Sequence, residues 1–148
     1  MLVLFVGQSI PLDHASDTDP FEDTSSGRRL QRWIDFLIKH EDRHLLVNAC
    51  SEPGADKATE EDLETLEYLI TSNVQPSAIV ALGKVAAAAL EEIGVPFFEL
   101  PHPSGLSRAM NNAPLVQSRL DDCFYFLYAH EKKGRRSNEY VDTTPKKP

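Results

Sequence analysis

Four short apolar runs, separated by segments with helical spacing, constrain the fold of this chain more than any other feature. The first run, residues 2–6, is wholly apolar and ends at Gly7, which is typical of a strand buried on both faces of a parallel sheet. The remaining runs are residues 45–47, 79–82 and 97–100. Strands that alternate with helices predict a parallel sheet with helices on both of its faces.

The segments between these runs carry the helical pattern. Between residues 29 and 40 the apolar side chains recur every three or four positions, as on the buried face of an amphipathic helix. Thr59 and Asp62 precede another such segment, and a hydroxyl and a carboxylate at this spacing can cap a first helical turn. Further helices are expected over residues 84–93 and 114–128. The predicted fold class is α/β, a three-layer α/β/α sandwich around a central, mostly parallel four-stranded sheet.

The length and composition fit one compact domain. With 148 residues, of which 41% are hydrophobic, the chain can bury a sizeable core. We expect a domain over residues 1–131, followed by a basic, flexible tail over residues 132–148. No apolar run approaches the roughly 20 residues that span a bilayer, and residues 1–7 lack the basic flank of a signal peptide. A cytoplasmic monomer with no membrane association is the expectation.

The spacing of the cysteines and the net charge of the chain indicate which ligands it can bind. Cys50 and Cys123 form no CxxC pair, so we expect reduced thiols, no metal and no cofactor. The formal net charge is −8, which argues against strong non-specific binding to nucleic acid, because phosphate binding draws on Lys and Arg. Six basic residues but only three acidic ones fall between positions 130 and 148, so the rest of the chain is more acidic still.

Three polar loops each follow an expected strand. They cover residues 8–27, 48–58 and 102–112. Because the carboxyl ends of parallel strands lie at one edge of a sheet, these loops should meet there, and in open α/β sheets this edge is where ligands bind.

Five sequence blocks lie in and around these loops. They are Val6-Gly7-Gln8-Ser9, Asp19-Pro20-Phe21 with Ser25-Ser26-Gly27-Arg28-Arg29-Leu30, Leu45-Leu46-Val47-Asn48, residues 76–86, and the segment that starts with His102-Pro103-Ser104. In this order the blocks resemble the uracil-DNA glycosylase superfamily over most of residues 1–129. The resemblance is strongest to the family 4 and 5 type branch, which carries an iron-sulfur cluster. It implies a protein of base excision repair that binds DNA.

The resemblance implies a role for each matching residue. A base cannot be processed inside the stack, so such enzymes flip it into a pocket. There Phe21 would stack on the base and Asn48 would pair with its edge. Gln8 would bind the base and also take part in catalysis. His102 would stabilise negative charge on the departing base, and Leu106 would fill the gap in the duplex. The remaining residues that would contact DNA are Ser104, Arg108, Ser26 and Arg28.

The chain also departs from the superfamily pattern. Ser9 stands where the most familiar branch has a water-activating Asp, although the iron-sulfur branch has Ala there. Asp13, His14 or Asp17 could replace that carboxylate, and the sequence does not choose among them. The cysteines that would bind a cluster are missing, so we expect none.

Two further interpretations stay open beside a monofunctional glycosylase for uracil or a related modified pyrimidine in single- or double-stranded DNA. The first is a catalytically weak or inactive superfamily member that uses the pocket to bind a base, a nucleotide or a protein partner. The second is an enzyme acting on free nucleosides or nucleotides. Structural roles also compete with the functional ones, since His102 and Asn48 could be ordinary loop and turn residues and Phe21 could pack on the core.

Overall fold

The computed structural model describes residues 1–9, 25–103 and 113–135, with side chains described for 1–9, 27–103 and 113–129. Its elements, in chain order, are β1 (Leu2–Gly7), α1 (Ser25–Leu37), β2 (Arg43–Asn48), α2 (Glu60–Tyr68), the π-helical turn η2 (Leu69–Asn73), β3 (Ala78–Leu82), α3 (Lys84–Ile93), β4 (Phe98–Leu100) and α4 (Ala113–Arg135).

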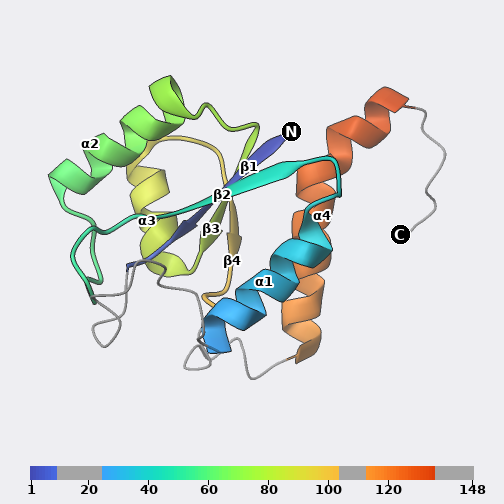
Figure 1. Ribbon diagram of the computed structural model, residues 1–148, viewed down its shortest axis with the longest axis horizontal. Helices are drawn as coiled ribbons and strands as arrows, with labels where there is room; N and C mark the ends of the chain where they lie inside the picture. Colours follow the sequence, from blue (N-terminus) through green and yellow to red (C-terminus); the bar gives the residue numbers. More distant parts are fainter. Residues whose placement is uncertain (10–24, 104–112, 136–148) are drawn as a thin grey trace.

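The four strands form one sheet in the order β2-β1-β3-β4, and every neighbouring pair is parallel. Helices α2 and α3 cover one face of this sheet, and α1 and α4 cover the other (Figure 1). The predicted three-layer α/β/α fold is therefore confirmed, with a sheet that is wholly parallel over its described strands. The strand order reverses direction between β1 and β3, which makes their carboxyl ends the topological switch point of the sheet.

The apolar run of β1 is explained by burial on both faces. Val3 and Phe5 pack into the core under α1 and α4, while Leu4 and Val6 pack into the core under α2 and α3. All four side chains are fully buried. A strand with helices on each side must be apolar at every position, which is why β1 does not alternate between apolar and polar residues.

The ends of the helices follow from local chemistry in two cases. Helix α3 has the predicted bounds and ends at Gly94, which takes a left-handed conformation with φ of 90° that costs glycine little. The predicted cap of α2 is also confirmed, because Thr59 Oγ1 accepts from Asp62 N and the Asp62 carboxylate accepts from Thr59 N.

Two other helices differ from the predicted bounds. Helix α1 begins at Ser25, four residues before the predicted start at residue 29. The prediction missed its first turn because that turn is polar and shows no apolar periodicity. Helix α4 continues to Arg135, past residue 128, where the predicted helix ended. No helix in the described part of the chain is both long enough and apolar enough to cross a membrane.

A cluster of polar groups joins the amino edge of the sheet to α4. The Asp42 carboxylate accepts from the amino group of Met1 and from Tyr128 Oη, each at 2.9 Å. Burial disfavours the charged form of Asp42, but these hydrogen bonds outweigh it and lower the pKa of the carboxyl below its usual value.

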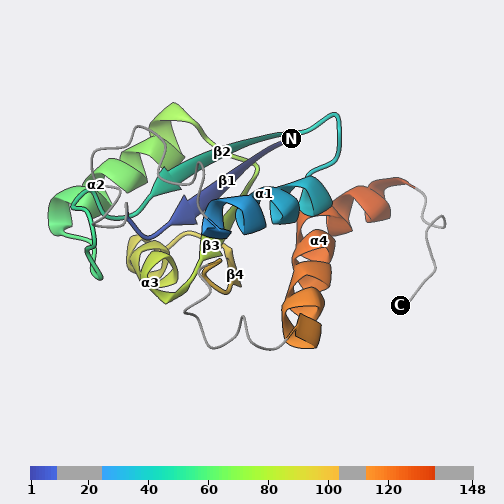
Figure 2. The ribbon, with the colours of Figure 1, turned by 60° about the horizontal axis from the view of Figure 1, so that its bottom comes forward.

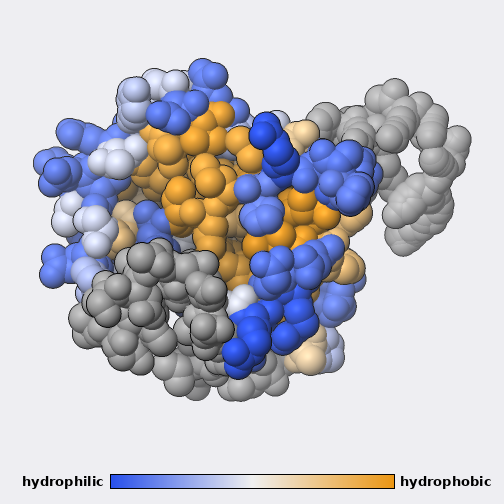
Figure 3. All heavy atoms as spheres, viewed as in Figure 1, coloured by the Kyte–Doolittle hydropathy of each residue, from blue (hydrophilic) through white to orange (hydrophobic). Residues whose placement is uncertain are grey.

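Strand β2 forms an edge of the sheet and is the least covered strand. Arg43, His44 and Leu45 at its start are exposed, Leu45 to 38%. Figure 3 shows apolar side chains over the middle of the face on which β2 lies, with hydrophilic side chains around them.

Candidate functional site

A cleft lies where β1, β3 and β4 end, beside the switch point of the sheet. Its volume is about 700 Å³, within the range of sites that bind small molecules. Figure 2 brings this edge of the sheet forward. The residues that line the cleft are Gln8, Gly83, Lys84, Val85, Glu99, Leu100, Pro101, His102, Leu115 and Arg119.

Gln8 follows β1 and joins the cleft to the loop after β2. Its side-chain Nε2 donates to the main-chain oxygen of Ala55 at 2.7 Å, and its main-chain oxygen accepts from Cys50 N at 2.9 Å. Ser9 Oγ donates to the same Ala55 oxygen at 3.3 Å. The end of β1 and the loop of residues 49–58 are thus held together at the edge of the cleft.

Asn48 is the last residue of β2 and pairs with Gly7 in the sheet register, so it lies one strand away from Gln8. Its side-chain oxygen Oδ1 is buried and has no hydrogen-bond partner among the described residues. A buried acceptor without a partner costs about 1–3 kcal/mol, and such atoms are rare in native structures. Within the described part of the chain, no group donates a hydrogen bond to this oxygen.

His102 lies two residues after β4 and packs against Gly83. A Cβ atom placed on Gly83 would lie 3.0 Å from the Cβ of His102, and Gly83 has a φ of +96°, so glycine allows both the backbone turn and the close approach. Burial lowers the pKa of the half-buried His102 imidazole below its usual value. At neutral pH the ring is uncharged and can donate from one nitrogen.

Three charged residues in the cleft were not identified from the sequence. They are Lys84 at the start of α3, Glu99 on β4 and Arg119 on α4. Arg119 is fixed by a hydrogen bond from Nη2 to the Glu99 carbonyl oxygen at 2.6 Å and by its position 4.5 Å over the Phe98 ring. No local motif marks these side chains, because three separate elements bring them together.

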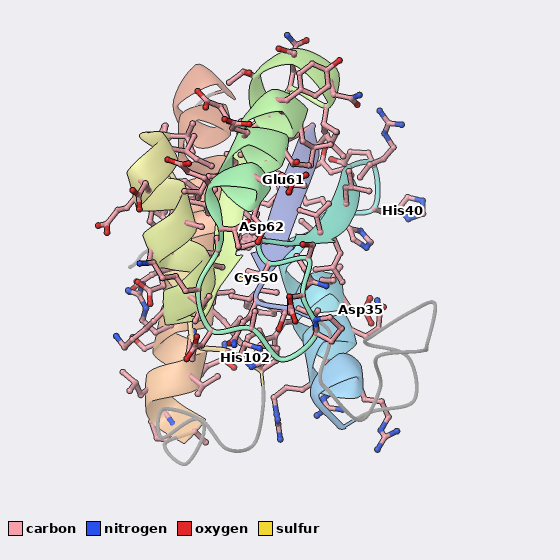
Figure 4. The ribbon with its side chains drawn as sticks, turned by 90° about the vertical axis from the view of Figure 1, so that its left-hand side faces the viewer. Asp35, His40, Cys50, Glu61, Asp62 and His102 are labelled. Atoms are coloured by element: carbon pink, nitrogen blue, oxygen red, sulfur yellow. The ribbon has the colours of Figure 1, made fainter. Side chains whose placement is uncertain are left out.

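The Asp62 carboxylate anchors the loop of residues 49–58. Besides capping α2, it accepts from Ser51 N at 3.3 Å. The hydrogen bond from Thr59 N, together with those from Ser51 and the Thr59 hydroxyl, lowers the pKa of Asp62 in spite of its burial. Figure 4, viewed from the side of α2, shows Cys50 of this loop between Asp62 and His102.

The structure brings some of the predicted site residues together and leaves others undescribed. Gln8 and His102 line one cleft, and Asn48 ends the strand beside Gln8. Arg28 is exposed in the first turn of α1. Ser26 lies in the same turn, with its side chain outside the described part. The predicted residues outside the description altogether are Phe21, Ser104, Leu106, Arg108, Asp13, His14 and Asp17.

Both cysteines are buried thiols, and burial raises the pKa of Cys123 to about 12. Among the residues whose positions are described, no group of three or more His, Cys, Asp or Glu side chains is placed to hold a metal ion.

Comparison with models of protein families gives a match to the uracil DNA glycosylase superfamily over residues 2–123. The matched region contains the complete sheet and reaches into α4. A search of the curated proteins found no match.

Proposed function

Because the chain belongs to the uracil DNA glycosylase superfamily, we propose that it is a DNA glycosylase that flips uracil or a related modified pyrimidine out of DNA and excises it. The N-glycosidic bond between C1′ and the base nitrogen breaks, and its electron pair leaves with the base. Water supplies hydroxide to C1′ and a proton to the departing base.

The observation that supports this proposal best is the buried Oδ1 of Asn48, which has no hydrogen-bond partner among the described residues. Uracil presents an N–H group beside a carbonyl oxygen on its pairing edge, and the side-chain amide of Asn offers the complementary acceptor and donor. A flipped base would supply the hydrogen bond that Oδ1 lacks within the described part of the chain, and its binding would offset the cost of burying that oxygen.

We assign to His102 the role of stabilising the negative charge on the leaving base. Charge develops on a carbonyl oxygen of the base as the bond breaks, and a hydrogen-bond donor already held at that place stabilises it. An uncharged imidazole at the cleft wall can donate in this way. Lys84 and Arg119 in the same cleft outnumber Glu99 and would attract the anionic base and DNA phosphates.

One observation favours the second candidate, a superfamily member that binds a base, a nucleotide or a protein without turnover. The hydroxyl of Ser9 donates to the Ala55 carbonyl oxygen, and a hydroxyl is too weakly basic to activate water as a carboxylate does. This candidate predicts binding through the cleft that survives His102→Ala.

A single-turnover cleavage assay on uracil-containing single- and double-stranded oligonucleotides, with enzyme in excess, tests the proposal. We expect His102→Ala to lower the rate by about 10²–10³, as for removal of one oxyanion donor, and Asn48→Ala to lower it as well.

The matched controls are His40→Ala and Asn73→Ala, which change exposed residues, His40 being well separated from His102 (Figure 4). Their rates should stay at the wild-type level. Absence of product from the wild-type protein on uracil and on several modified pyrimidines would overturn the proposed activity and favour the binding protein.

A further inference from the structure

One hydrogen bond crosses from α1 to the segment that carries His102. Arg29, in the second turn of α1, donates from Nη1 to the carbonyl oxygen of Pro103, the residue next to His102. Pro103 is fully buried and Arg29 is half-buried. A buried carbonyl needs a donor, and a guanidinium is a permanently charged donor with fixed planar geometry.

The same segment is held from its other side by the turn after β3. Gly83 N donates to the Leu100 carbonyl oxygen at 2.8 Å, and the absence of a side chain at Gly83 lets His102 approach closely. His102 thus lies between one anchor on the β3 side, at Leu100, and another on the α1 side, at Pro103. Only the second anchor depends on a single side chain.

We propose that Arg29 is a positioning residue, whose hydrogen bond to the Pro103 carbonyl holds the His102 imidazole at the cleft wall. This inference rests on the proposed function for its effect on rate. A misplacement of about 1 Å in a catalytic group can cost about 10² in rate, and loss of the Arg29 contact frees the backbone one residue from the imidazole.

The charged groups around the cleft determine how His102 would respond to a change at Arg29. They are Arg29 from α1, Lys84 from α3, Glu99 from β4 and Arg119 from α4. Removal of a cation and exposure of the ring to water both favour the protonated imidazole. In Arg29→Lys the cation stays, so a rise in the pKa of His102 reports the changed position of the ring.

The test compares Arg29→Lys, Arg29→Gln and the control Arg32→Ala, which removes an exposed arginine from the same helix. Single-turnover cleavage of a uracil-containing single-stranded oligonucleotide, over a range of enzyme concentrations, separates rate from binding. An NMR titration of the histidine side chains reports the pKa of His102 without any substrate.

We expect Arg29→Lys and Arg29→Gln to lower the maximal rate about tenfold or more, with half-saturation unchanged within about twofold, and to move the pKa of His102 up towards the ordinary histidine value. Arg32→Ala should change neither quantity. A wild-type rate together with an unmoved His102 pKa in Arg29→Lys would overturn the positioning role.

The experiment distinguishes failure of the proposed function from failure of the positioning role. If the wild-type protein cleaves no base, the excision proposal fails, and the titration alone decides the role of Arg29. An unchanged His102 pKa in folded Arg29→Lys then overturns it, and an upward shift in that variant supports it. An unchanged pKa in folded Arg29→Gln overturns it as well, because loss of the cation and exposure of the ring should both raise the pKa there.

Discussion

Gly83 and Gly94 flank α3 and both have a positive φ, but they differ in the space available for a Cβ atom. At Gly83 an added Cβ would lie 3.0 Å from the Cβ of His102, whereas at Gly94 no atom of a described residue would lie within 4 Å of it. Gly94→Ala should therefore cost only the backbone strain of a left-handed residue, about 1–2 kcal/mol. Gly83→Ala adds a steric clash, so we expect a larger loss of stability in urea unfolding, together with a lower cleavage rate.

The comparison of these two variants separates backbone strain from the packing of His102. Gly94→Ala should keep the wild-type rate after correction for the folded fraction. Equal stability losses and equal rates for the two alanine variants would mean that the Gly83 contact with His102 has no functional importance.

At the scale of elements, Asp62 links α2 to the loop that follows β2. Its carboxylate accepts from Thr59 N and Ser51 N, and hydrogen bonds to a charged group contribute about 1.5–3 kcal/mol. Asp62→Asn places an N–H group against one of these donors. We expect a loss of about 1–3 kcal/mol in the free energy of unfolding at pH 7, measured by urea titration, while Glu61→Gln, exposed in the same turn, should change it by less than about 0.5 kcal/mol.

The pH dependence of that loss has a definite sign. The pKa of Asp62 is lowered in the folded protein, so its stabilisation is fully present above the unfolded pKa of about 3.9 and is lost as the pH falls through the folded value. The stability difference between wild type and Asp62→Asn should stay constant from pH 7 to about pH 5 and shrink below about pH 4. A difference that grows on acidification would contradict this assignment.

The sequence predicts most of the elements because their signals are local. The apolar runs locate all four strands, and Thr59 and Gly94 mark two helix ends. The first turn of α1 and the π-helical turn η2 carry no such signal. Gln75, whose φ is 50°, is not glycine and therefore gives no sign of its left-handed turn.

The candidate site is predictable only where a polar residue lies at or just after the end of a strand. Gln8 follows β1, Asn48 ends β2 and His102 lies two residues after β4, and the parallel sheet brings these strand ends to one edge. Arg29 and Arg119 reach the site from helices, so their contacts depend on how α1 and α4 cross the sheet. Helix packing of that kind is set by tertiary contacts and not by a local pattern.

At the scale of the whole molecule, the net charge of −8 conflicts with DNA binding only if the acidic groups act on the cleft. Glu91 and Glu92 are exposed near the end of α3, roughly 10 Å along the helix axis from Lys84 at its start. That distance exceeds the screening length of about 8 Å at physiological ionic strength. In the lining of the cleft, Lys84 and Arg119 outnumber the single acidic residue Glu99, so we expect a local excess of positive charge there.

This argument predicts a specific salt dependence of DNA binding. If Lys84 contacts one phosphate, Lys84→Ala should reduce the slope of log K against log salt concentration by about 0.7 for single-stranded DNA and about 0.9 for duplex DNA, measured by fluorescence anisotropy at several salt concentrations. Arg43→Ala removes the same charge from the opposite edge of the sheet, where Arg43 pairs with Leu2 and is exposed, so its slope should equal that of the wild type. Equal slopes for Lys84→Ala and Arg43→Ala would show that net charge, and not the charge of the cleft, governs binding.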